Sequence, residues 1–99
     1  DAPVALVVSI DARFGAGGYM DLGMTLYGLQ MAAAAQGLGS CAIGALASYP
    51  DTVRRVLDLA PGEHIVCGLA LGWPDEAAPV NRTQTTRAPL SEYFKVLGE

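Results

Sequence analysis

The sequence predicts an α+β fold, an α/β sandwich in which helices pack against a central sheet. Three apolar runs have the length and composition of buried strands, and two helical segments separate them along the chain. The predicted order is therefore strand, helix, strand, helix, strand and tail, which favours helices packed on a sheet. The sequence does not determine the directions of these strands.

The first strand is predicted over residues 3–10 (PVALVVSI), a continuous run rich in β-branched residues. Such a run is typical of a strand that is covered on both faces. The Gly-rich, polar residues 11–18 (DARFGAGG) predict a loop.

The first helix is predicted over residues 21–36. Asp21 lies near its start, where a carboxylate suits the helix dipole, and Gly37 supplies the stop. The helix is apolar nearly all round, so most of its surface must be covered, and we expect it at or near an interface between two chains.

The next two elements are a strand over residues 40–46 (SCAIGAL) and a helix that begins at Pro50. Asp51 lies early in this helix and two arginines lie late, which matches the helix dipole. Pro61-Gly62 then signals a turn.

The last strand is predicted over residues 65–71 (IVCGLAL). Beyond it the composition becomes polar and proline-containing, which is typical of an extended arm. We therefore divide the chain into residues 1–74, the C-terminal part of a folded domain, and residues 75–99, a C-terminal arm. Residues 91–97 form a short segment of mixed polarity at the end.

Composition excludes several classes of function. The chain has 99 residues with a net charge of −4, and its six basic residues are mostly scattered, so nucleic acid is not an expected partner. The apolar stretch 22–35 is 14 residues long, whereas a membrane-spanning helix needs about 20. Cys41 and Cys67 lie in apolar runs without metal-ligand spacing, so we expect buried, reduced thiols of a cytoplasmic protein and no metal site.

No catalytic constellation is visible. Residues 37–42 match G-x-G-x-x-A, but a helix precedes them and a strand follows, which is the reverse of the order that a dinucleotide site needs. His64 is the one histidine and has no G-x-S-x-G partner motif, so we interpret it as a strand-edge residue. Asp75 and Glu76 are adjacent and fit a solvated turn. These absences favour an enzyme whose cofactor carries the chemistry.

Four segments of the chain carry a resemblance to a known family. They are DLGMTLYGLQMAAAAQGLGSC, YPDTVRRVLDL, VCGLALGWPDEAAPVN and TRAPLSEY. In this order and spacing they resemble the C-terminal part of the FMN-dependent nitroreductase family, notably its nitrobenzoate-reductase-like branch. The resemblance implies an intertwined homodimer with FMN at the interface, and electron transfer from NAD(P)H through the flavin to nitroaromatic or quinone-like acceptors.

The resemblance also implies the binding residues. The family's flavin-edge loop maps onto Ala42, Ile43, Gly44 and Ala45, whose backbone N–H groups would face flavin N5 and O4. The family's phosphate-binding arginine maps onto Arg87, whose planar guanidinium suits phosphate oxygens. No residue is expected to act as a catalytic group, because the flavin carries the chemistry.

Two departures and one gap accompany the resemblance. Related sequences often carry an acidic residue at the position of Gly44 and a basic one near Gln84 and Thr85. The family's N-terminal Arg-Ser-Arg type motif has no match, so we expect a fragment that alone binds FMN weakly. Gly44 could instead serve a strand bulge or close packing, and Arg87 could be a solvated arm residue. The alternative function is a non-catalytic nitroreductase-like dimerisation or binding module.

Overall fold

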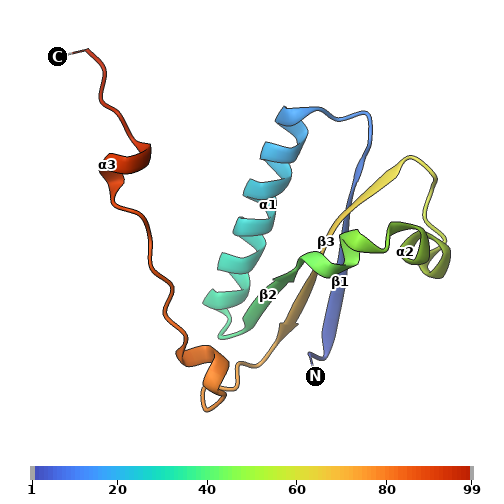
Figure 1. The fold of residues 1–99 in the computed structure, drawn as a ribbon. Coiled ribbons are helices and arrows are strands. Elements are labelled where there is room, and N and C mark those ends of the chain that lie inside the picture. The colour runs from blue at the N-terminus through green and yellow to red at the C-terminus, as the bar shows by residue number, and fades with distance from the viewer. Residues whose placement is uncertain (1, 99) are drawn as a thin grey trace.

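A computed structural model describes residues 2–98 and contains one antiparallel sheet of three strands. The strands are β1 (Val4–Asp11), β2 (Gly39–Ile43) and β3 (Glu63–Gly72), in the spatial order β1-β3-β2. Figure 1 shows helix α1 (Ala16–Ala35) along one side of this sheet, and the 3₁₀ helix η1 (Gly44–Ser48) with helix α2 (Pro50–Leu57) on the other. The predicted α+β fold and the predicted order of elements are confirmed.

Strand β3 is the centre of the sheet because both other strands pair with it. Its pairing with β1 shifts register at one point: Val8 lies opposite Cys67 and Ser9 opposite Ile65, so Val66 has no partner residue. An extra residue of this kind forms a β-bulge, which increases the local twist.

Helix α1 (Ala16–Ala35) begins earlier than predicted. Its first turn contains no acidic residue, so the expected role of Asp21 at the helix start is wrong. Two of the glycines that suggest a loop, Gly17 and Gly18, lie inside the helix, and Gly18 has a packing reason to be there. A Cβ atom at Gly18 would lie only 2.6 Å from the Cβ atom of Phe14, so a larger residue would push the preceding loop away.

The end of α1 confirms the prediction of a glycine stop. Gly37 has φ +75°, a conformation that residues with a Cβ atom rarely adopt. Its N–H donates to the carbonyl of Ala34 at 2.9 Å, and the N–H of Leu38 donates to the carbonyl of Ala33 at 3.0 Å. This pair of bonds is the Schellman arrangement that closes many helices.

The strand predicted over residues 40–46 is shorter in the structure. β2 ends at Ile43, and η1 (Gly44–Ser48) follows it. Helix α2 (Pro50–Leu57) then begins at the proline, as predicted, with Asp51 in its first turn.

Beyond β3 the chain forms an extended arm with two short helical turns, η2 (Pro79–Arg82) and α3 (Leu90–Tyr93). Figure 1 shows this arm running away from the sheet. The radius of gyration is 17.0 Å, whereas a compact domain of this length has about 13 Å, and the arm accounts for the excess.

The core of the described residues is small, and its buried apolar side chains are Ala33, Val53, Ile65, Cys67 and Leu69. Cys67 is a buried free thiol as predicted, but Cys41 is exposed, so the prediction of a buried thiol there is wrong. Cys41 lies on β2, at one edge of the sheet, where nothing in residues 2–98 covers it.

Helix α1 is not covered within this chain. One face turns its half-buried side chains, such as Leu22 and Leu26, toward the sheet. The opposite face is also apolar and is exposed. We call it the outer stripe of α1: Met20, Met24, Tyr27 and Met31. Along residues 2–98 no helix is both long and apolar enough to cross a membrane.

Candidate functional site

The segment predicted to face the flavin edge lies where β2 passes into η1. Ala42 and Ile43 are the last two residues of β2, opposite Leu69 and Gly68 of β3. Gly44 and Ala45 begin η1, and all four predicted residues are exposed. The structure therefore presents residues 42–45 as one continuous, accessible stretch of backbone.

Gly44 is not explained by packing. A Cβ atom built on Gly44 would meet no other atom within 4 Å, so close packing does not require glycine there. The register shift of the sheet lies between β1 and β3, so Gly44 is not a strand bulge either. Because Gly44 has no side chain, one face of its backbone is open, and a flat ring could approach it closely.

Arg87 lies in the arm, between η2 and α3, and is exposed. Its Nη1 donates to Thr85 Oγ1 at 2.6 Å and to the carbonyl of Thr86 at 3.0 Å. Within residues 2–98 its Nε and Nη2 atoms make no hydrogen bond, so the N–H groups of these two nitrogens remain for an anion.

These two parts of the predicted site are not brought together within one chain. The arm leaves the sheet after Gly72, which pairs with Gly39 at the start of β2, whereas Gly44 follows the other end of that strand. Figure 1 shows the arm well separated from η1. The open backbone at Gly44 and the donors of Arg87 are each chemically suited to one end of an FMN molecule, and neither residue lines either of the two best-formed pockets in residues 2–98.

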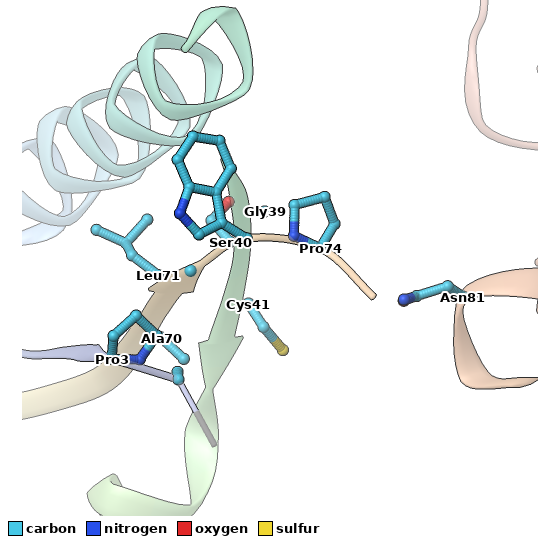
Figure 2. A pocket seen from close by; sticks show the side chains of 11 residues that line it. Pro3, Gly39, Ser40, Cys41, Ala70, Leu71, Pro74 and Asn81 are labelled. Atoms are coloured by element: carbon cyan, nitrogen blue, oxygen red, sulfur yellow. The ribbon is translucent and has the colours of Figure 1, made fainter. Parts of the chain in front are cut away.

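A pocket of about 290 Å³ lies instead at the start of the arm. Figure 2 shows it between the first residues of β2, the end of β3 and Asn81, with the ring of Pro74 and the thiol of Cys41 beside it. Trp73 also lines this pocket. The side-chain amide of Asn81 already donates to the carbonyl of Asp75 at 2.6 Å. This pocket is separate from residues 42–45, and sequence reasoning did not identify it, because its walls come from four separate parts of the chain.

His64 has a structural partner. The Tyr19 hydroxyl and His64 Nδ1 are 2.6 Å apart, and the two rings meet edge to face with centroids 6.0 Å apart. This contact ties the first turn of α1 to the start of β3. His64 is exposed in the second position of β3, which confirms its interpretation as a strand-edge residue.

The strongest local charge effect lies at the end of β1, far from residues 42–45 in sequence. The Nε atom of Arg13 donates to both carboxylate oxygens of Asp11 at 3.0 Å. These side-chain bonds, and the backbone N–H of Arg13, lower the pKa of Asp11, and the carboxylate in turn raises the pKa of Arg13. The pair orders the turn before α1 and does not contact the candidate site.

Comparison with known proteins explains the arrangement of these elements. The model of the nitroreductase family matches residues 1–73. A 4-nitrobenzoate reductase from Pseudomonas putida is 31% identical over 97 residues, which cover 98% of this chain and 43% of the relative. A chloronitrobenzene nitroreductase from Comamonas testosteroni is 31% identical over 99 residues, covering all of this chain and 44% of the relative.

Solved structures agree with this assignment. The FMN and NADPH-dependent nitroreductase NfnB from Sphigopyxis sp. strain HMH is 36% identical with a TM-score of 0.94, over 99% of this chain and 44% of the other. The FMN-dependent NfnB from Mycobacterium smegmatis, in complex with NADPH, is 30% identical with a TM-score of 0.86, over 96% and 42%. The chain thus spans less than half the length of these relatives, and over that span it belongs to the nitroreductase family.

Proposed function

We propose that the protein containing this chain is an FMN-dependent oxidoreductase of the nitroreductase type. It passes electrons from NAD(P)H through the flavin to nitroaromatic or quinone-like acceptors, in the cytoplasm. The observation that carries the proposal is the agreement of nearly the whole chain, at substantial identity, with an FMN and NADPH-dependent nitroreductase. The four sequence segments that resemble the family lie along this same span.

Bound FMN would supply the electron-transfer chemistry, and the residues of this chain would bind and orient it. The backbone N–H groups of residues 42–45 would face the edge of the flavin ring, and the open backbone at Gly44 leaves room for that approach. The free donors of Arg87 would hold the phosphate. Because these two groups are separated within one chain, either the FMN extends between them or they come from two copies of the chain.

The chain spans less than half of its relatives, and we propose that it acts as a fragment of the FMN site. The 99-residue chain alone should then bind FMN weakly or not at all. Titration of FMN into the purified chain, followed by quenching of flavin fluorescence, tests this directly. Tight binding at one FMN per chain would show that these residues suffice.

We further propose a homodimer in which the outer stripe of α1 lies at the interface. This stripe exposes three methionines and a tyrosine on one face of a helix, at the spacing that packs against another helix. Gly28 lies between Met24 and Met31 on this face, and a Cβ atom there would meet nothing within 4 Å of its own chain. Gly28 therefore leaves room for a helix of a second chain to approach closely.

Replacing Gly28 with leucine tests the dimer. The side chain has room within the chain, so the fold should persist, but the close approach of a second helix should not. Sedimentation velocity should show a shift from dimer to monomer, with unchanged circular dichroism. Unchanged sedimentation would place the interface elsewhere.

The alternative, a non-catalytic dimerisation or binding module, is favoured by one departure from the family pattern: a glycine stands at position 44, where the resemblance implies an acidic residue. Visible absorption of the purified protein at its full natural length separates the two functions. A yellow protein that oxidises NAD(P)H in the presence of a nitroaromatic supports the enzyme. A colourless protein that still dimerises supports the module.

A further inference from the structure

We infer that Leu46 and Gly68 are positioning residues for the backbone segment 42–45. The side chain of Leu46 rests on Gly68 and thereby holds the N–H groups of this segment where the flavin edge would lie. The inference deepens the proposed function and rests on it. Neither residue is itself expected to touch the flavin.

The contact is unusually close because Gly68 has no side chain. A Cβ atom built on Gly68 would lie 2.6 Å from Leu46 Cδ1 and 3.5 Å from Leu46 Cγ. Leu46 therefore occupies the space in which any other residue at position 68 would place its side chain. Gly68 is buried and Leu46 is half-buried, so the contact belongs to the small interior of the chain.

Gly68 also holds the other end of the segment. It is the β3 partner of Ile43, the last residue of β2. The chain leaves this pair, turns through Gly44 and Ala45, and returns to the same glycine through the side chain of Leu46. The two attachments to one residue thus bracket the residues whose N–H groups are proposed to face the flavin.

The bracketed residues have little else to hold them. Gly44 has no side chain and would contact nothing within 4 Å through a Cβ atom, and Ala45 is exposed. After Leu46, the N–H of Tyr49 donates to the carbonyl of Leu46 at 3.2 Å, which closes the turn of η1. Leu46 is therefore the side chain that seats the turn on the sheet.

The test is a set of variants at one strand. Gly68→Ala puts a methyl group into the space of Leu46 and should displace the turn. Gly72→Ala is the matched control, because it lies on the same strand and its Cβ atom would lie 2.7 Å from Pro3 Cδ, a similarly close contact far from η1. The double variant Gly68→Ala/Leu46→Ala removes the clash, and the new methyl group at position 68 fills part of the space that Leu46 leaves, so the turn should return toward its native position.

Two measurements on the protein at its full natural length report the outcome. In the flavin-free form, NMR shifts of the backbone amides of residues 43–47 should change in Gly68→Ala, remain in place in Gly72→Ala, and return toward native values in the double variant. In the FMN-bound form, Gly68→Ala should shift the midpoint potential of the flavin and lower kcat roughly tenfold or more, because a misplacement near 1 Å can cost about a hundredfold. The double variant should recover most of the native midpoint potential and most of the native kcat.

The outcomes separate this inference from the proposed function. If the amide shifts change in Gly68→Ala but the native protein binds no FMN, the contact of Leu46 with Gly68 is supported and the proposed flavin function is refuted. Native FMN binding with no change of shifts, potential or kcat in Gly68→Ala would overturn the positioning role and leave the proposed function intact. An equal effect of Gly72→Ala would also overturn it. If Gly68→Ala fails to fold, Leu46→Ala alone should still loosen the turn and shift the potential, and a native potential would refute the inference.

Discussion

Replacing Val53 with alanine should destabilise the chain by about 1 kcal/mol more than the same replacement at Val56, one turn later in α2. Both residues lie in the helix that follows η1, but Val53 is 8% exposed and Val56 is 71% exposed. The pair is well matched because both substitutions remove the same atoms. Both also gain the same helix propensity, which cancels in the difference.

The magnitude follows from the buried fractions. Removing two methyl-sized groups from a fully buried site costs about 1.6 kcal/mol of transfer free energy, at about 0.8 kcal/mol for each group. Scaled by the buried fraction of each side chain, the loss is about 1.5 kcal/mol at Val53 and about 0.5 kcal/mol at Val56. Any cavity that remains beneath Val53 would increase the difference.

Urea denaturation of the two variants beside the native chain measures this difference, and thermal unfolding should show midpoints separated by roughly 4–8 °C. Equal destabilisation of both variants would refute the reasoning from burial within one chain. Repeating the experiment over a range of protein concentrations then identifies the cause, because a second chain covering Val56 makes the unfolding midpoint depend on concentration.

Three further substitutions have outcomes that the structure predicts. Tyr19→Phe removes the 2.6 Å hydrogen bond to His64 and should lower the free energy of unfolding by about 0.5–1 kcal/mol; no loss in urea denaturation would mean the bond is not formed in solution. Arg13→Gln should raise the pKa of Asp11 toward its ordinary value, as an NMR titration would show. Because the folded-state pKa is lowered, the stabilisation is present above the unfolded pKa and disappears as the pH falls through the folded value, so the acid side of the stability profile should flatten in the variant. Gly37→Ala forces a Cβ atom into φ +75° and should cost about 1 kcal/mol in thermal unfolding, and a stabilised variant would contradict this account of the helix end.

Two of the errors made from the sequence concern glycines. Gly17 and Gly18 suggest a loop by local preference, yet they lie inside α1, where Gly18 packs against Phe14. Gly44 follows an apolar run and was expected within a strand, yet the sheet pairing ends at Ile43 and a 3₁₀ turn begins. The contact of Gly18 with Phe14 is local, whereas the turn after Ile43 lies against another strand, because Leu46 meets Gly68 of β3.

The candidate site was predicted only in part. The resemblance identified residues 42–45 and Arg87, and the structure places the first four on one exposed stretch of backbone. Their shared role toward FMN stays a prediction. The contact of Leu46 with Gly68 had no signal in the sequence, because two residues far apart in the chain become neighbours only when β2 pairs with β3.

The family, the order of the elements and the helix ends that depend on a single residue could be predicted from residue order alone; such ends are the stop at Gly37 and the start at Pro50. These features follow from preferences that act between near neighbours: the spacing of apolar residues, the freedom of glycine and the fixed φ of proline. The three-dimensional arrangement was needed to learn that β3 lies between β1 and β2, that Cys41 is exposed, and that residues 2–98 leave one face of α1 uncovered. These depend on which distant segments pair and pack, and that is set by the total burial and hydrogen bonding of the folded chain.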